Sequence, residues 1–396
     1  MEKEILINLY VESMLSIAEI TKKMAKSTPS VTKVINQLIE QEVIVECGFA
    51  ESTGGRRPIQ YKISDQLKSY IISIACDQFF TTISISDLHN NIIVDSRDIP
   101  LELKNRSSLD TILNHTSELI KRSEIKIENF IGIGVSLPGF VNSELGINES
   151  YQKNHNLYKL QQNIEKSLKI PTVIENDSRC IALAEKQLGL AKNITSSLII
   201  NLNWGVGLGI IINNNIFKGT AGYAGEFSHI PLADNQMLCS CGKRGCLEVV
   251  ASLNAAIKNI ENDIENEQYS IYSTFVNSNH HNKIEALFDS IRVGDQVAIN
   301  NIGKIGYMLG KGISTLIHIL NPKQILISGR GSEVGHILNP HIQIALNEFC
   351  IPEIAKTTNV TISELNKDAQ VKGTMCLVVE NLIHRIFKSN YTQINQ

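Results

Sequence analysis

Hydrophobic residues recur at helical spacing in the first forty residues of the chain. One helix opens the chain, and a second begins at Ser16, where a serine followed by Glu19 is the sequence of a capping box. A third helix is expected after a short break, with Thr28 as its cap and Pro29 at its first position, where a missing N–H costs nothing. Its buried face is expected to hold Val31, Val34, Ile35 and Leu38.

Two strand-like segments follow, at residues 43–45 and 59–63. Between them lies the sequence Gly54-Gly55-Arg56-Arg57-Pro58. We call this hairpin, residues 43–63, the wing. Three helices followed by a hairpin with a basic tip are typical of a winged helix-turn-helix. We therefore expect a DNA-binding domain over residues 1–64.

From about residue 70 the pattern becomes that of an α/β protein, with hydrophobic strands that lead into polar loops. Strands are expected at 71–76, 81–86, 91–94, 130–135, 172–174, 197–201, 207–212 and 323–327. Helices are expected at 109–121, 180–188 and through a stretch that ends near 320. Since the later strands begin a second sheet, we expect two lobes with a cleft. They cover residues 65–185, completed by a C-terminal helix at 374–390, and residues 186–373.

The net charge of the whole chain is −3, which argues against a protein coated with positive charge for nucleic acid. The distribution of charge changes this conclusion. Residues 1–64 hold eight basic and eight acidic residues, but six of the basic ones gather around the turn, on the third helix and at the tip of the wing: Lys22, Lys23, Lys26, Lys33, Arg56 and Arg57. The alternative is a protein-interaction domain with ordinary solvated lysines. The residues expected to contact DNA are Lys26, Ser30, Thr32, Lys33, Asn36, Arg56 and Arg57.

The composition is that of a globular protein, with 43% hydrophobic and 19% charged residues over a length of 396. No hydrophobic run approaches the roughly 18 residues of a membrane span, and the N-terminus lacks a signal-peptide core. We therefore expect a cytoplasmic protein with no membrane partner. Because cytosolic cysteines rarely form disulfides, a cluster of cysteines in such a chain suggests metal binding or catalysis.

Three of the eight cysteines follow a histidine in the pattern H-x9-C-x-C-x4-C, at His229, Cys239, Cys241 and Cys246. One imidazole and three thiolates form the closed tetrahedral set that Zn²⁺ prefers in structural sites. Since all four positions are filled, no position is open for an activated water. The alternative is a redox or merely buried cluster. The other five cysteines are expected to be small buried apolar residues.

Carboxylates and amides lie near this cluster in the sequence. Asn176 and Asp177 follow a strand, Glu226 precedes the histidine of the cluster, and Glu248 follows its last cysteine. Such groups hydrogen-bond vicinal hydroxyls, and buried polar sites discriminate strongly between ligands. Each residue alone would more often be a helix cap or a surface charge, but together they favour a sugar pocket.

Two segments carry a resemblance to a known family: residues 225–229, Gly-Glu-Phe-Ser-His, and residues 239–248, which contain the cysteines. Residues 136–139, 175–177 and 205–209 support it in the expected order. The chain resembles the ROK family (repressors, open reading frames and sugar kinases) over nearly its whole length. One departure is a serine at position 228, where the family usually has glycine.

The resemblance implies a two-lobed, actin-like (ribonuclease H-like) sugar-kinase fold, which here follows the winged helix-turn-helix expected from the pattern of residues 1–64. It also implies zinc at His229, Cys239, Cys241 and Cys246. The sugar contacts that it implies are Asn176, Asp177, Glu226, His229 and Glu248.

The family contains both repressors and kinases, and the first hairpin of the fold separates them. Family kinases carry D-x-G-G-T there, because a glycine pair lets the backbone approach the phosphates of ATP. In one register Ala75 replaces the aspartate and residues 77–78 replace the glycines; in the other, residues 79–80, Phe-Phe, replace them. Either way the close approach is lost. Asp177, which would be the general base of a kinase, is then left only to bind.

We therefore predict a transcriptional regulator of carbohydrate metabolism genes, of the repressor type. Its catalytically inactive sugar-kinase-like domain would sense a sugar or a sugar phosphate. Binding would change lobe closure and the spacing of DNA-binding heads in a homodimer or homotetramer on operator DNA. The alternatives are an ATP-dependent sugar kinase with an appended domain, and a partner-binding protein without DNA. Neither the sugar nor the operator follows from the sequence.

Overall fold

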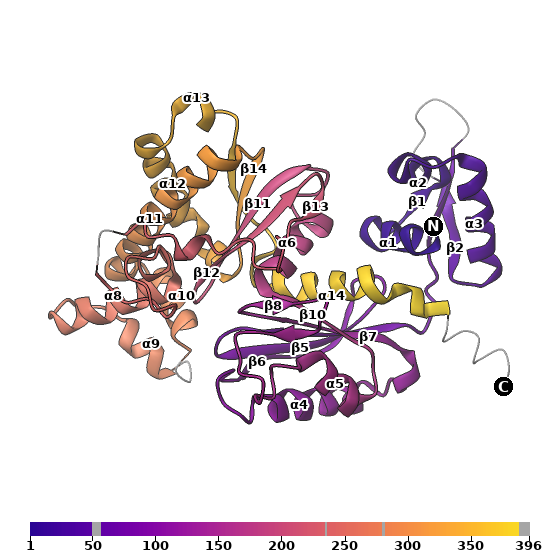
Figure 1. Cartoon of the computed structure of the whole chain (residues 1–396), viewed down its shortest axis with the longest axis horizontal. Coiled ribbons are helices and arrows are strands. Elements are labelled where there is room, and N and C mark those ends of the chain that lie inside the picture. Colours follow the sequence, from indigo (N-terminus) through magenta and orange to yellow (C-terminus); the bar gives the residue numbers. More distant parts are fainter. Residues whose placement is uncertain (50–56, 234–235, 279–281, 388–396) are drawn as a thin grey trace. The chain divides into compact units, whose positions relative to one another are not determined.

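The computed structural model describes residues 1–49, 57–233, 236–278 and 282–387 (Figure 1). The chain divides into two compact units, one formed by residues 1–175 with the C-terminal segment from 374, the other by residues 176–373. The lobe boundary predicted between residues 185 and 186 therefore differs from this division, which comes at Asn176. The reason is that helix α6 (Asp177–Leu188) packs on strands β11 (Ser196–Leu202) and β12 (Val206–Ile212) of the second unit.

The N-terminal segment folds as three helices and a small sheet, in the order expected of a winged helix-turn-helix. Antiparallel pairs give the sheet the order β1-β3-β2. The predicted capping box is present, because Ser16 Oγ accepts from the Glu19 amide at 3.3 Å and Glu19 accepts from the Ser16 amide at 2.8 Å. The elements are α1 (Glu2–Glu12), β1 (Leu15–Ser16), α2 (Ile17–Met24), α3 (Thr28–Glu40), β2 (Ile44–Phe49) and β3 (Ile59–Ile63).

Two details of α3 differ from the prediction. Its cap is Ser27 and not Thr28, because Ser27 has extended backbone angles whereas Thr28 is already helical. Val34 is only half-buried, since the buried stripe of the helix consists of Val31, Ile35 and Leu38.

The first unit also holds a five-stranded sheet in the order β10-β7-β4-β5-β6. Strands β4, β5 and β6 form antiparallel neighbours, and β7 runs parallel to β4. The strands are β4 (Tyr70–Cys76), β5 (Phe80–Asp87), β6 (Ile92–Pro100), β7 (Phe130–Leu137) and β10 (Thr172–Asn176). The other elements are α4 (Ser108–Ser123), η1 (Ile127–Asn129), β8 (Val141–Asn142), β9 (Ile147–Asn148) and α5 (Leu160–Leu168).

The last helix of the chain, α14 (Ala369–Leu382), packs on this first sheet and is followed by η5 (Ile383–Arg385). Two glycines of β7 make room for it. A Cβ on Gly134 would lie 2.7 Å from the carbonyl oxygen of Thr374, and one on Gly132 would lie 2.2 Å from Leu382 Cδ1. Of the predicted helix 374–390, the final residues 388–390 lie outside the described residues.

The second unit contains a sheet of the same plan, in the order β13-β12-β11-β14-β15. Strand β11 pairs antiparallel with β12 and parallel with β14, as β4 does with β5 and β7. The shared topology of the two sheets confirms the predicted ribonuclease H-like fold. We found no strong sequence repeat that corresponds to this structural repeat. The remaining strands are β13 (Asn215–Ile216), β14 (Gln324–Ser328) and β15 (Asn359–Ile362). The helices are η2 (Phe227–His229), α7 (Glu248–Ala251), α8 (Leu253–Glu265), α9 (Tyr272–Ser278), α10 (Lys283–Arg292), α11 (Gln296–Leu320), η3 (Arg330–Val334), α12 (Gly335–Phe349), α13 (Pro352–Ala355) and η4 (Asn366–Asp368).

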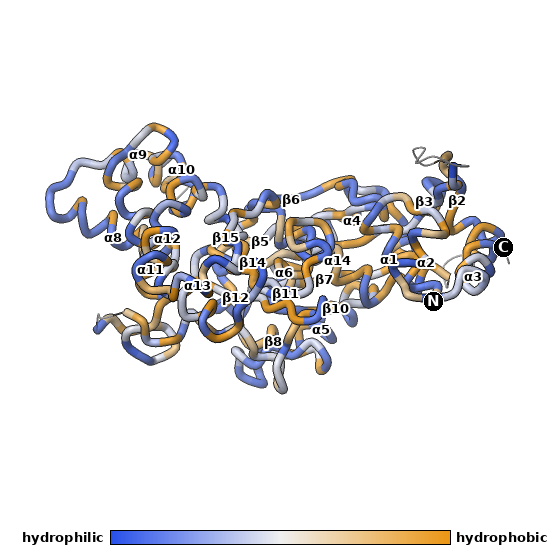
Figure 2. Tube along the Cα trace, turned by 90° about the horizontal axis from the view of Figure 1, so that it is seen from above, coloured by the Kyte–Doolittle hydropathy of each residue, from blue (hydrophilic) through white to orange (hydrophobic). Residues whose placement is uncertain are grey.

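Each sheet has a hydrophobic core of its own. Figure 2 shows hydrophobic residues concentrated along strands such as β7 and β11, while peripheral loops are mostly hydrophilic. Among the helices of the described residues, none is both long enough and apolar enough to cross a membrane.

Candidate functional site

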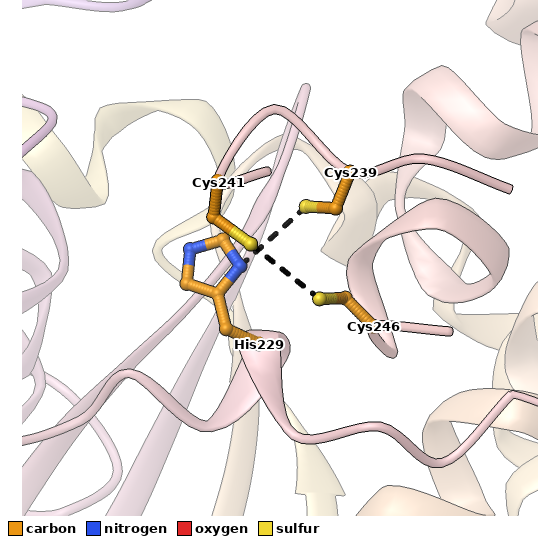
Figure 3. Close-up of side chains that lie close together, drawn as sticks. All are labelled: His229, Cys239, Cys241 and Cys246. Atoms are coloured by element: carbon orange, nitrogen blue, oxygen red, sulfur yellow. Dashed lines mark hydrogen bonds between the residues drawn. The ribbon is translucent and has the colours of Figure 1, made fainter. Parts of the chain in front are cut away.

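His229 and the three clustered cysteines converge in the second unit, as Figure 3 shows. Their ligand atoms all lie within 4.8 Å of one another. His229 Nδ1 lies 3.6 Å from Cys239 Sγ, and the sulfurs of Cys241 and Cys246 are also 3.6 Å apart. Ligands about 2.0–2.3 Å from one tetrahedral ion lie roughly 3.6–3.8 Å from each other. These two separations therefore match those between ligands of one tetrahedral ion.

The surroundings of the cluster fit a metal in one further respect. The second ring nitrogen of His229, Nε2, faces Glu226 Oε2 at 3.6 Å, and metal-bound histidines commonly present that N–H to a carboxylate. Burial raises the pKa of the Cys246 thiol to about 12, so a metal ion bound here would have to displace its proton.

Two glycines place the carboxylates Glu226 and Glu248 beside the cluster. Gly225 has φ +106°, and a Cβ there would lie 2.2 Å from the carbonyl oxygen of Leu208, so only glycine brings this segment so close to β12. A Cβ on Gly205 would lie 2.8 Å from Glu248 Oε2, so this glycine leaves room for the carboxylate. Glu248 Oε1 in turn lies 3.8 Å from Cys239 Sγ.

Asn176 and Asp177 lie where β10 leads into α6, and both help to begin that helix. Asn176 Oδ1 accepts from the amides of Ser178 and Arg179 at 3.0 and 3.2 Å, which makes it the N-cap. Asp177 Oδ1 accepts from the Ser178 amide at 2.7 Å, and its Oδ2 accepts from Asn201 Nδ2 at 3.3 Å. The structure thus gives both residues structural contacts, and it adds Asn201, which the sequence did not indicate.

Arg179 is a second residue that sequence reasoning missed. It is buried in α6, and its guanidinium donates to the Gly222 carbonyl. Desolvation raises the pKa of the Glu226 carboxyl, while His229 and Arg179 lower it and Glu248 raises it. These effects show that the start of α6 and the carboxylates beside the metal cluster belong to one polar region. In the sequence, the only indication of Arg179 was its position two residues after the candidate site residue Asp177.

The glycine run of residues 205–209 is explained by packing. A Cβ on Gly207 would lie 1.9 Å from Ser178 Oγ, and one on Gly209 would lie 2.3 Å from the Cβ of Ala182. Helix α6 therefore rests directly on the backbone of β12. Together with Gly205, these glycines hold Asp177, through α6, and Glu248 near the beginning of one strand.

The first hairpin has side chains where a phosphate loop needs bare backbone. Strands β4 and β5 pair up to Cys76 and Thr81, and the Asp77 amide donates to the Phe80 carbonyl at 2.7 Å. Residues 78–79 therefore form the tip of the turn. Thr81 is buried, and its hydroxyl donates to the Ala75 carbonyl at 3.2 Å.

The residues expected to contact DNA are accessible wherever they are described. Lys26, in the turn before α3, is exposed, as are Ser30, Lys33 and Asn36 on that helix. Thr32 is half-buried, and its hydroxyl donates to the Thr28 carbonyl at 2.9 Å. On the wing Arg57 is exposed, whereas Arg56 lies outside the described residues.

Comparison with known proteins places this site in a family. A family model described as "ROK family" matches residues 83–381, most of the chain. The chain belongs to the ROK family. The residues before 83, which include the winged segment, lie outside the matched range.

Among ROK proteins, repressors resemble this chain over nearly their whole length. The xylose repressor of Bacillus spizizenii is 26% identical over 381 residues, which cover 96% of this chain and 94% of that protein. The transcriptional dual regulator NagC of Escherichia coli is 29% identical over 374 residues, covering 94% and 90% of the two chains.

Solved structures of ROK proteins show the same architecture. A ROK family transcriptional regulator, described as a homologue of the E. coli MLC protein, superposes with a TM-score of 0.75 at 25% identity. The alignment covers 98% of this chain and 99% of that one. A ROK glucokinase from Streptomyces griseus, solved with glucose and AMPPNP, has a TM-score of 0.67 at 21% identity. It covers 78% of this chain and 99% of its own, and it shares the fold.

Proposed function

We propose that this protein is a sugar-responsive transcriptional repressor that binds operator DNA through residues 1–64. The observation that carries this function is the winged helix-turn-helix ahead of the ROK fold. Regulators of the family align with 94–98% of the chain, whereas the glucokinase aligns with 78%. Helix α3 would enter the major groove, with Ser30, Thr32, Lys33 and Asn36 toward the bases. Lys26, Arg56 and Arg57 would contact phosphates.

The metal of this repressor is proposed to be structural Zn²⁺, held by His229, Cys239, Cys241 and Cys246. The donor set and its spacing fit zinc, and four protein ligands leave no position for catalysis. When bound, the ion would fix the loop between η2 and α7 and so hold Glu226 and Glu248 in place.

The effector is proposed to bind beside this metal. Its hydroxyls would contact Asn176, Asp177, Glu226, His229 and Glu248. Support comes from the polar region that joins the start of α6 to the carboxylates around the cluster. We expect the active species to be a homodimer or homotetramer, because paired DNA-binding heads match the two halves of an operator.

Phosphoryl transfer is not part of the proposed function. Bare backbone at the first hairpin is what a kinase needs to approach ATP, and here Gln78 and Phe79 occupy the turn. The ATP-dependent sugar kinase is therefore the second candidate, supported by the shared fold and by Asp177 at the position of the general base.

The experiment begins with selection of bound fragments from random DNA by the full-length protein. A mobility-shift assay with the selected site then measures release by xylose, N-acetylglucosamine, glucose and their phosphates. Release by one of these compounds, without ATP consumption, is the expected result. Failure to select any DNA would refute the repressor function, and sugar-dependent ATP turnover would establish the kinase.

A further inference from the structure

A loop of the second unit leads from β13 to η2 and ends in Glu226, one of the two carboxylates beside the metal cluster. We call residues 217–226 the Glu226 loop. Three of its residues, Gly219, Gly222 and Gly225, have positive φ angles of 70°, 81° and 106°. Glycine loses more conformational freedom on ordering than any other residue, so a loop of this composition needs contacts with its surroundings to keep one shape.

Backbone hydrogen bonds hold the two ends of the Glu226 loop. The Phe217 amide donates to the Ile210 carbonyl of β12 at 2.8 Å, and the Ala224 amide donates to the Lys218 carbonyl at 3.1 Å. These bonds fix where the loop leaves the sheet and where it closes on itself. Residues 219–223 lie beyond this closure, and there the loop receives a side chain from another element.

That side chain is Arg179 of α6, whose guanidinium donates from Nη1 to the Gly222 carbonyl. Only 5% of Arg179 is exposed. Although the two residues are 43 positions apart in the chain, the bond ties the middle of the Glu226 loop to the first turn of the helix that begins at Asp177. Both partners belong to the second unit, so the tie lies within one compact body.

The position of Arg179 is unfavourable by the rules of helix formation. A cation in the first turn faces the positive end of the helix dipole, and a buried cation loses its hydration. A residue that breaks such a local rule is expected where function requires it. Two groups compensate the charge, the Gly222 carbonyl and the Glu226 carboxylate. Burial raises the pKa of the Glu226 carboxyl, and His229 and Arg179 oppose that shift.

We propose that Arg179 is a positioning residue of the effector site, which holds the Glu226 loop through the carbonyl of Gly222 and so keeps Glu226 near the start of α6. The inference rests on the proposed function, because Glu226 and Asp177 are effector contacts proposed there. Without the tie, the effector has to order the loop as it binds, and the cost of that ordering weakens binding.

The first test needs no effector. Hydrogen exchange of the full-length protein, measured by mass spectrometry, reports the opening of the loop. Arg179→Met removes the donor and the charge but keeps a long side chain, and peptides that cover residues 217–226 should then exchange about tenfold faster or more. Arg179→Lys keeps a charged donor and should restore most of the protection. The matched control is Lys186→Gln, which removes a cation from the last turn of the same helix and should exchange as the wild type does.

Equal exchange of these peptides in the wild type and in Arg179→Met would overturn the proposal. Peptides from α8 serve as an internal reference, because a rise in their exchange as well would indicate a loss of folding. Thermal unfolding and zinc content check the same point. If Arg179→Met does not fold, Arg179→Gln, which keeps a polar group in the helix, takes its place with the same expected and contradicting results.

The second test measures release of the selected DNA by xylose, N-acetylglucosamine, glucose and their phosphates. A compound that releases DNA from the wild type should be needed at about tenfold higher concentration or more with Arg179→Met. Arg179→Lys and Lys186→Gln should respond near the wild-type concentration. If Arg179→Met exchanges faster but releases DNA as the wild type does, Arg179 is a purely structural residue and this inference fails, while the repressor function stands. If no compound releases DNA from the wild type although the loop of Arg179→Met exchanges faster, the tie stands and the proposed effector control fails.

Discussion

Asn201 donates its side-chain amide to Oδ2 of Asp177 at 3.3 Å and to Oγ of Ser178 at 3.1 Å. The end of β11 is therefore tied to the first turn of α6 through the residue that would be the base of a kinase. Since the other oxygen of Asp177 accepts from the Ser178 amide, the carboxylate is held as a fixed acceptor.

From this geometry we expect Asp177→Asn to weaken binding of the effector. The rate of ATP turnover should be the same in the variant and the wild type, because the proposed function includes no phosphoryl transfer. An amide keeps the size of the carboxylate but loses its charge, so a hydrogen bond to a sugar hydroxyl loses about 1–2 kcal/mol. Calorimetry with the effector and a coupled ATPase assay measure the two quantities. Asp110→Asn, on the exposed face of α4, serves as the control. Sugar-dependent ATP hydrolysis that disappears in Asp177→Asn would contradict the prediction.

Removal of the metal should disorganise the effector site. We expect Cys246→Ser to lose zinc and to bind the effector at least about tenfold more weakly, because second-sphere and ligand changes of this kind have effects of that order. Metal content by mass spectrometry, thermal unfolding and effector binding give three independent readouts. Cys47→Ser, on the wing strand β2, should retain the metal. A zinc-free preparation with normal effector affinity would show that the cluster does not organise the site.

On the DNA-binding side, Arg57→Ala should weaken binding uniformly across sequences. An exposed arginine on the wing would contact phosphate, so its loss should reduce the slope of log affinity against log salt by about 1. Asn36→Ala should instead relax the sequence preference, since α3 is expected to contact base edges. Mobility shifts over a series of salt concentrations measure both, with Lys126→Ala as an exposed control outside the winged segment. An unchanged affinity and slope in Arg57→Ala would remove the wing from the interface.

A pH dependence is expected from Glu185, a fully buried carboxyl of α6. Its Oε1 accepts from Ser328 Oγ at 2.7 Å and from Ser363 Oγ, yet burial raises its pKa above the ordinary value of 4.5. The folded state therefore holds this proton to higher pH than the unfolded state does, and ionisation destabilises the fold. As pH rises from about 4 to neutral, the wild type should lose free energy of unfolding relative to Glu185→Gln.

The measurement is urea unfolding of the two proteins at several pH values, with the exposed Glu118→Gln as control. Only the pH dependence of the difference is diagnostic, because glutamine also loses the acceptor for the Leu190 amide at every pH. A difference that stays constant across this range would mean that Glu185 ionises as an ordinary carboxyl.

Local chemistry made some of these features predictable from the sequence. The capping box at Ser16 and the metal ligands His229, Cys239, Cys241 and Cys246 depend on residue types at short spacing, and the structure brings each set together. The family resemblance then supplied the two-lobed fold, which the repeated sheet topology confirms.

Other features depend on contacts between distant segments and left no local signal. Ser363 lies 178 residues from its partner Glu185, and Asn201 lies 24 residues from Asp177. In the sequence, the glycine run at 205–209 served only as support for the family resemblance. Its role in seating α6 is visible only once Ser178 and Ala182 are known to face it.

The return of α14 to the first sheet has a consequence for how the protein is made. Gly134 of β7 is covered by Thr374, whose hydroxyl also donates to Ser136 at 2.8 Å. The second unit is one continuous segment of the chain, and it leaves the ribosome before the part of α14 that belongs to the first unit. The second unit can therefore fold while the chain is still being synthesised. Until synthesis is nearly finished, the first sheet lacks the helix that covers its face of small residues, among them Ser73, Ser84 and Gly134. Termination between residues 176 and 374 would therefore leave the first unit without the segment that completes it.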